Sequence, residues 1–304
     1  MTTHLITGVG GQDGLLLSRH LVAAGHRVVG TSLPGSEPVA APPAEVVVVP
    51  LDITDRAAFA RVIAEQRPAV VHNLAGLSSV SRSWREPEET KRVNDDAVLA
   101  MLEVLADHPE VAFVQASSSE IFGPGTGAAV SETTPLNPQS PYAEAKASAH
   151  VGVQQARAQG RAASNIVLFG HTSELQPAHF ALPTICRAAA AIGRGERDRL
   201  EVQNPRVRRD WGSARDHVRA FALAADEAAD DYVIGTGTLT QLGEVIEWAL
   251  AAAGVPDAVV EVTGSDRPTD HDGLVADHSL ARRALGWEPI IALREEIERM
   301  VRRS

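Results

Sequence analysis

The 304-residue chain contains a single cysteine, Cys186, which excludes an intramolecular disulfide and suits a reducing cytoplasm. Its longest apolar runs, such as residues 46–49, are too short to cross a bilayer, and its first residues enter a strand pattern with no charged-then-apolar leader. Basic residues are in deficit, and the formal net charge is -11. Because that charge repels phosphate backbones and anionic lipids, we expect a cytoplasmic protein that binds neither nucleic acid nor membrane.

Lysine and tyrosine are equally scarce. The only lysines are Lys91 and Lys146, and the only tyrosines are Tyr142 and Tyr232. The excess of arginine and alanine indicates a genomic composition bias, so a lysine retained against it is a candidate functional residue. Hydrophobic residues nevertheless make up 44% of the chain, which is enough to bury one large core or two coupled ones.

Short apolar strands alternate with helix-length segments over the first half of the chain. The expected strands are residues 4–7, 27–31, 45–49, 69–73, 111–117 and 165–169, followed later by 231–235. The expected helices are residues 57–66, 88–107 and 142–159, followed by 184–192, 242–253 and 292–302. The first βαβ unit requires a right-handed crossover, so the alternation predicts an α/β fold with a doubly wound parallel Rossmann sheet and a smaller, mostly C-terminal α/β domain.

A glycine loop connects the first expected strand to the helix that follows it. Gly8, Gly11 and Gly14 have the spacing that allows a tight turn and brings a pyrophosphate close to backbone N–H groups at a helix N-terminus. An acidic residue after the second strand would favour NAD and an arginine would favour NADP, but Thr31, Ser32 and Leu33 offer neither. The absence of a cation for a 2′-phosphate leaves NAD or NADP possible and favours NAD.

Tyr142 and Lys146 lie one helical turn apart and therefore face the same side of their helix. An adjacent cation lowers the pKa of a phenol, and such a phenol takes a proton from a substrate hydroxyl while hydride leaves the same carbon. Ser118, Ser119 and Glu120 follow the strand at 111–117, at the sheet edge where ligands bind. Glu120 is informative because hydride transfer at one carbon needs no second base.

Several motifs together resemble the extended short-chain dehydrogenase/reductases and, within them, the GDP-mannose 4,6-dehydratase family. They are ITGVGGQDG, HNLAGLSSV, QASSSEIFG, SETTPLNPQSPYAEAK, RRDWGSARD, RPTD and LGWEP, which span nearly the whole chain. The resemblance implies that Tyr142 is the base at the sugar 4-hydroxyl, that Lys146 assists it and holds the nicotinamide ribose, and that Ser118 replaces the usual threonine. It also implies that Glu120 removes the C5 proton and helps to expel water from C6.

The resemblance further implies how the two ligands are held. The dinucleotide is expected to contact Gly8, Gly11, Gln12, Asp13, Gly14, Ser32, Asp52, Ile53, Leu74, Ala75, Tyr142 and Lys146. A nucleotide-diphosphate sugar is expected to contact Ser79, Ser119, Gly170, His171, Arg209 and Arg267, with the two arginines gripping the diphosphate. No metal is expected. The dinucleotide-binding domain is expected at residues 1–168 plus about 214–240, the sugar-binding domain at about 169–213 plus 241–304, and a homodimer interface at the helices 88–107 and 142–159.

The chain also departs from the family pattern. Gly170 and His171 stand where the dehydratases have Asn-His, the cofactor loop lacks their arginine pair, and an insertion before RPTD is mostly missing. We therefore expect a nucleotide-sugar 4,6-dehydratase with GDP-mannose as the leading substrate, against a 4-epimerase, a 4-keto-6-deoxy-sugar reductase or a decarboxylase of the same fold. A non-catalytic dinucleotide sensor has no need of Ser118, Tyr142 and Lys146 together.

Overall fold

The computed structural model describes residues 1–125, 128–264 and 273–304. In these residues the largest element is a seven-stranded parallel sheet with the order β3-β2-β1-β4-β5-β7-β12. Its strands are β1 (Thr3–Thr7), β2 (Arg27–Ser32), β3 (Val47–Pro50), β4 (Val70–Asn73), β5 (Ala112–Ser118), β7 (Ala163–Leu168) and β12 (Asp231–Ile234). The chain reverses its direction across the sheet between β1 and β4, and such a switch point opens a ligand crevice at the carboxyl ends of the strands.

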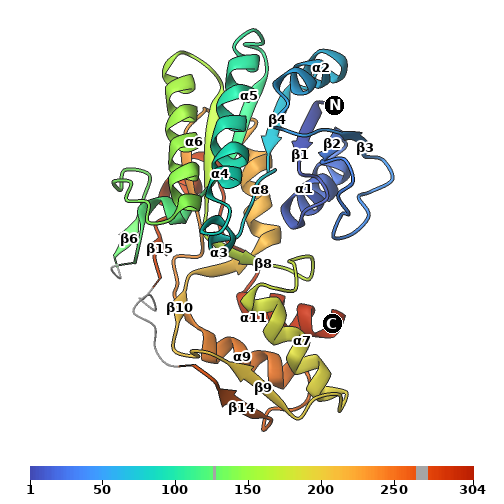
Figure 1. The fold of residues 1–304 in the computed structure, drawn as a ribbon, viewed down its shortest axis with the longest axis vertical. Coiled ribbons are helices and arrows are strands. Elements are labelled where there is room, and N and C mark those ends of the chain that lie inside the picture. Colours follow the sequence, from blue (N-terminus) through green and yellow to red (C-terminus); the bar gives the residue numbers. More distant parts are fainter. Residues whose placement is uncertain (126–127, 265–272) are drawn as a thin grey trace.

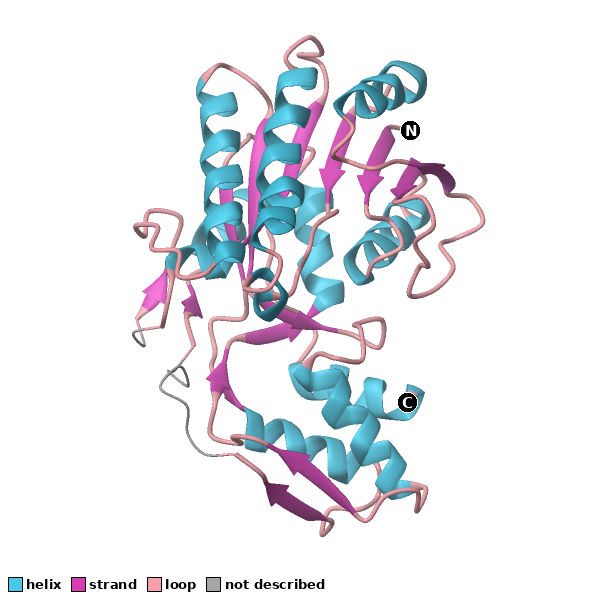
Figure 2. Cartoon of the chain, viewed as in Figure 1, coloured by secondary structure: helices cyan, strands magenta, loops and turns pink. Residues whose placement is uncertain are grey.

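Helices cover both faces of this sheet (Figures 1 and 2). One face packs against α1 (Gln12–Ala23), α8 (Ala214–Ala224) and α10 (Ser279–Leu285), and the other against α2 (Arg56–Gln66), α5 (Ala97–Leu105) and α6 (Pro141–Ala158). Apart from the exposed edge strand β3, the strands are buried on both sides and are therefore rich in apolar residues. The α/β fold and the parallel sheet expected from the sequence are confirmed.

The segment expected to form one helix at residues 88–107 is helical but not uniform. It consists of α4 (Pro87–Lys91), a π-helical turn at Arg92–Asp96 and α5, and it is preceded by the short α3 (Val80–Ser83). A π-turn inserts an extra residue into the helix and is often found at functional sites. Here it turns Asn94 inward, as described below.

A smaller lobe lies below the sheet in Figure 1. Its helices α7 (Ala181–Gly193), α9 (Leu242–Ala252) and α11 (Leu293–Arg303) pack together with the parallel pair β9 (Arg199–Val202) and β14 (Val259–Val262). Cys186 is fully buried in this cluster, which confirms that it is a packing residue.

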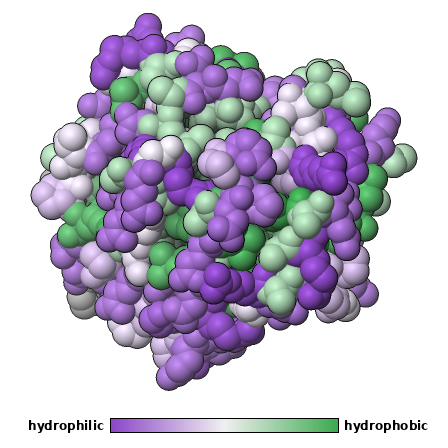
Figure 3. Space-filling model, turned by 90° about the horizontal axis from the view of Figure 1, so that it is seen from above, coloured by the Kyte–Doolittle hydropathy of each residue, from purple (hydrophilic) through white to green (hydrophobic). Residues whose placement is uncertain are grey.

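Short strand pairs connect the two parts. They are β8 (Gly170–Thr172) with β11 (Trp211–Ser213), β10 (Arg208–Arg209) with β13 (Thr240–Gln241), and β6 (Ala129–Val130) with β15 (Val275–Ala276). Within the described ranges, no helix combines the length and the apolar character that a membrane span needs. Seen from above, hydrophilic residues are spread over the surface, with apolar residues in small groups between them (Figure 3).

Candidate active site

Two neighbouring cavities lie at the carboxyl ends of the central strands. The first, of about 630 Å³, is lined by the glycine loop, by Ser117 to Glu120 and by Tyr142 and Lys146. The second, of about 1020 Å³, extends from Ser119 and Glu120 toward the smaller lobe. Because Ser119 and Glu120 line both cavities, a ligand in one reaches a ligand in the other at this point.

The glycine loop forms a tight turn that ends in the amino terminus of α1. Gly8 has a φ of 68°, the left-handed region, and the N–H of Gly11 donates to the Gly8 carbonyl at 3.1 Å. A Cβ on Gly14 would lie only 2.4 Å from that same carbonyl oxygen. No side chain caps α1 at Gly11, so its first N–H groups are left for an anion. These features fit the pyrophosphate of a dinucleotide.

The remaining dinucleotide residues expected from the sequence lie along the same sheet edge. Leu74 lines the first cavity, and the N–H of Ala75 donates to the Thr7 hydroxyl at 3.1 Å. Ser32 ends β2, while Asp52 and Ile53 follow β3. The carboxylate of Asp52 accepts hydrogen bonds from the backbone and the hydroxyl of Thr54. Ser32, Asp52, Ile53 and Ala75 do not line the first cavity. For all of the expected dinucleotide residues, contact with the dinucleotide stays a prediction.

Tyr142 and Lys146 are presented by the first two turns of α6. Ser140 caps this helix by accepting a hydrogen bond from the N–H of Ala143 at 3.1 Å, and Pro141 occupies its first turn. The Lys146 Nζ donates to the Ala116 carbonyl at 2.9 Å. Both side chains are buried and both line the first cavity, as their spacing predicted.

The protonation of this pair differs from the expectation. Burial raises the pKa of Tyr142 to about 12, against a hydrogen bond with Ser118 that lowers it, and burial lowers the pKa of Lys146 to about 8. The expected lowering of the phenol's pKa by Lys146 is therefore wrong for the protein alone. The physical reason is that removal from water disfavours both charged forms.

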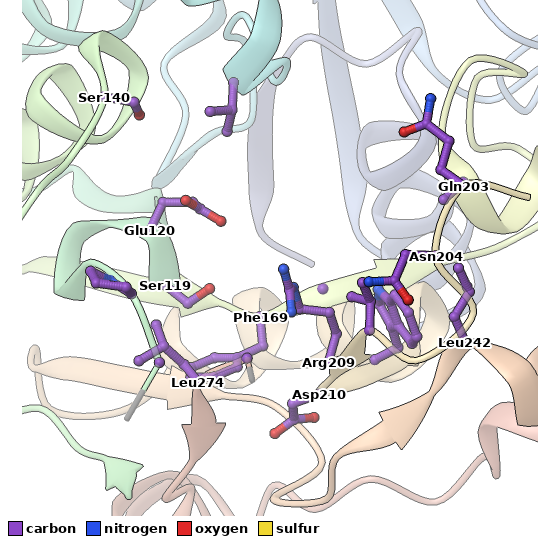
Figure 4. A pocket seen from close by; sticks show the side chains of 18 of the residues that line it. Ser119, Glu120, Ser140, Phe169, Gln203, Asn204, Arg209, Asp210, Leu242 and Leu274 are labelled. Carbon is purple, nitrogen blue, oxygen red and sulfur yellow. The ribbon is translucent and has the colours of Figure 1, made fainter. Parts of the chain in front are cut away.

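Glu120 enters the cavities from a 3-10 helix, Ser119–Phe122, which follows β5. The Ser118 hydroxyl caps this helix by accepting the N–H of Glu120 at 3.3 Å. Glu120 is exposed at the cavity wall, but desolvation by the surrounding protein raises its pKa, and the positive charge of Arg209 opposes that shift. Figure 4 shows the side chains of Glu120 and Arg209 directed into the same space from opposite walls. The arrangement suits a carboxyl group that takes up and returns a proton.

The structure places most of the expected substrate residues around the second cavity and its junction with the first. Arg209, Ser119 and Gly170 line the second cavity, and Ser79 and His171 line the first. At the end of the second cavity farthest from Glu120, the residues Gln203, Asn204 and Leu242 belong to the smaller lobe (Figure 4). The expected contact at Arg267 lies outside the described residues.

The structure also shows residues near the site that our sequence reasoning missed. The buried Asn94 binds the backbone of Leu77 twice, accepting its N–H at 2.8 Å and donating to its carbonyl at 2.9 Å. Leu77 lines the first cavity, so the π-turn holds part of the cavity wall. Asn73 and Gln115 bond to each other across β4 and β5 at 2.8 Å. A polar residue inside an apolar segment was the available signal at Asn73 and Gln115, whereas Asn94 lies among charged residues and gave no such signal.

Comparison with known proteins supports this description. The model of the family described as GDP-mannose 4,6 dehydratase matches residues 5–300. A GDP-mannose 4,6-dehydratase of Sinorhizobium fredii is 33% identical over 98% of this chain and 95% of its own. Two solved structures share the fold: a dTDP-glucose 4,6-dehydratase of Bacillus anthracis in complex with NAD, and RMD from Pseudomonas aeruginosa complexed with NADPH. The B. anthracis structure has a TM-score of 0.86 at 18% identity, with 99% of this chain and 96% of that chain covered. The P. aeruginosa structure has a TM-score of 0.85 at 22% identity, with 99% of this chain and 97% of that chain covered.

Proposed function

Because the chain belongs to the GDP-mannose 4,6-dehydratase family of NAD(P)-dependent lyases, we propose that it converts GDP-mannose to GDP-4-keto-6-deoxymannose. The observation that carries this proposal is the position of Glu120. It gives the site a second proton-transfer group beside Tyr142 and Lys146, and it faces both cavities. A reaction that only oxidised and reduced C4 would not need the Glu120 carboxyl group as a second proton-transfer group.

The proposed reaction uses each of these side chains at one atom. In the ligand-bound site Tyr142 acts as a phenolate, which Lys146 stabilises, and accepts the proton of the sugar 4-hydroxyl. The ketone at C4 acidifies C5, where Glu120 removes the proton. Glu120 then delivers that proton to the C6 hydroxyl, which leaves as water. A bound nicotinamide dinucleotide would supply the two-electron acceptor and donor. The proton taken from the 4-hydroxyl then returns to C5, so that the net change is the loss of one water from the sugar.

The resting pKa values support a site that changes its charge only when its ligands bind. With a pKa of about 12, the phenol of Tyr142 keeps its proton in the protein alone. The raised pKa of Glu120 makes the carboxyl group a better base than an exposed glutamate and brings it closer to neutral pH. Both properties are expected of groups that return the proton they take.

We further propose that NAD is the preferred dinucleotide, because residues 30–33 offer no cation to a 2′-phosphate. The proposed sugar-binding domain is residues 169–213 plus 241–304, and the proposed dimer interface is formed by the helices at 88–107 and 142–159. Arg209, at the wall of the second cavity, is proposed to bind the substrate diphosphate.

Mass spectrometry of the product tests the proposal. Purified protein incubated with GDP-mannose and NAD should yield a nucleotide sugar lighter by one water, which borohydride then reduces to 6-deoxyhexoses. UDP-glucose and dTDP-glucose in parallel reactions test the nucleotide and the sugar. Recovery of an isomer of unchanged mass would contradict dehydration and indicate an epimerase.

A further inference from the structure

A partly buried ion pair connects the glycine loop to β8. Asp13, in the first turn of α1, lies with its Oδ2 3.0 Å from the Nε2 of His171. Both residues line the first cavity, which the glycine loop also lines. The side-chain amide of Gln12 donates from Nε2 to the other Asp13 oxygen at 3.0 Å, and the Ser173 hydroxyl donates to the Oε1 of the same amide at 2.9 Å. The pair therefore belongs to a chain of hydrogen bonds that leads from the cofactor loop to the start of the smaller lobe.

The partners of His171 determine its protonation. Its Nδ1 lies 2.7 Å from the carbonyl oxygen of Phe169, which only accepts, so this nitrogen must donate. Its Nε2 faces the Asp13 carboxylate, which as an anion also only accepts. An imidazole that donates from both nitrogens is an imidazolium. Since both nitrogens are committed, neither is left for a phosphate of the substrate.

The other groups around the pair agree with this charge. His217, on α8, stacks on His171 with ring centroids 4.7 Å apart. Burial, and to a smaller extent the charge of His171, lowers the pKa of His217 to about 3, so His217 is neutral. Burial lowers the pKa of His171, but the charge and the hydrogen bond of Asp13 outweigh this effect, so the pKa of His171 is raised above 6.5. For Asp13, burial raises the pKa, but the charge and the hydrogen bond of His171 lower it, and the net shift is downward. The negative charge of Asp13 also contributes to the raised pKa of Tyr142, on α6.

We propose that His171 is a positioning residue that acts through Asp13: its positive charge neutralises a carboxylate in the first turn of α1, so that an anionic dinucleotide binds at this helix terminus. Without that charge, Asp13 would place a partly buried, uncompensated anion beside the N–H groups that the pyrophosphate needs. The proposal rests on the dinucleotide binding that the proposed function includes, but not on the identity of the sugar.

The proposal gives dinucleotide binding an upper pH limit. Because the pKa of His171 is raised, its charge is present below pH 6.5 and is lost as the pH rises through the raised value. The affinity for dinucleotide should fall over that range. Lys146, which burial brings to a pKa of about 8, lines the same cavity and titrates in the same direction. Only a comparison between variants separates the two contributions.

The test is a fluorescence titration of nucleotide-stripped protein with NADH, and with NADPH in parallel, from pH 6 to 9.5 and without substrate. We expect His171→Gln to weaken binding roughly tenfold at pH 6.5, the scale of one uncompensated charge near the ligand, and to flatten part of the pH dependence. The double variant should bind more tightly than His171→Gln and as tightly as Asp13→Asn alone, because the carboxylate that His171 neutralises is then absent. The control is His108→Gln, a histidine paired only with the exposed Glu110 in the described contacts.

Each outcome is decisive. If the double variant binds as weakly as His171→Gln, or if that variant keeps the wild-type pH profile, His171 has a packing role and the proposal is overturned. Nitrogen-15 spectra of histidine-labelled protein give a second measurement, in which the signal missing from His171→Gln should show both nitrogens protonated at pH 6.5. Absence of any dinucleotide binding by the wild type would overturn the proposed function as well, whereas binding with a failed rescue would leave that function standing.

Discussion

Replacement of Glu120 by glutamine tests the assignment of the elimination step. The variant keeps the volume of the side chain and removes its ability to take a proton. The cap of the Ser119–Phe122 helix is formed by the backbone N–H of residue 120 and the Ser118 hydroxyl, so it survives the change. The fold should therefore remain intact, and any loss reports the chemistry.

The expected magnitude follows from the loss of general acid–base catalysis. Such catalysis contributes about 10²- to 10⁴-fold, or roughly 3 to 5 kcal/mol of the barrier. We therefore expect dehydration to fall by about 10³-fold or more. Oxidation at C4, which depends on Tyr142, should still proceed in part.

Two readouts separate these steps. Absorbance near 340 nm follows reduction of the dinucleotide, and mass spectrometry follows the loss of water. The matched control is Glu132→Gln, because burial also raises the pKa of Glu132, but its carboxylate accepts the N–H of Val233 and lines neither cavity. Dehydration by Glu120→Gln at a rate within a few-fold of the wild type would refute the assignment, as would an equal loss in Glu132→Gln.

Other predictions concern the acid limit of activity, the cofactor loop and stability. Arg209→Gln should move the acid limb of kcat to higher pH, because the guanidinium lowers the pKa of Glu120; an unmoved limb in the pH–rate profile would contradict this. Gly14→Ala should abolish NADH binding in a fluorescence titration, since its Cβ would lie 2.4 Å from the Gly8 carbonyl oxygen, and unchanged affinity would show that the loop relaxes. Burial, aided by His26, lowers the pKa of His4 to about 4, so the folded state disfavours its protonation and stability falls as the pH drops below 6.5. In urea titrations between pH 6.5 and 5, the wild type should lose more stability than His4→Gln, by up to about 1.4 kcal/mol per pH unit, and equal slopes would contradict the assignment.

The sequence alone predicted the architecture well because hydrophobic periodicity is local. The expected strand at 27–31 became Arg27–Ser32, and the expected helix at 142–159 became Pro141–Ala158. Boundaries shifted where the flanking residues are ambiguous, as at β3, expected at 45–49 and found at Val47–Pro50. The π-turn at Arg92–Asp96 was not predictable, because a single inserted residue barely alters the apolar pattern.

For the candidate site, the sequence by itself determined which groups share a helix face or a strand end. Tyr142 and Lys146 line one cavity because four residues make one helical turn. Only the tertiary structure decided their protonation, because burial depends on what packs over a side chain from elsewhere in the chain. It also decided the pairing of Asp13 with His171, which are 158 residues apart and meet where α1 and β8 converge. No local pattern encodes such a meeting, so the charge beside the glycine loop follows from the fold.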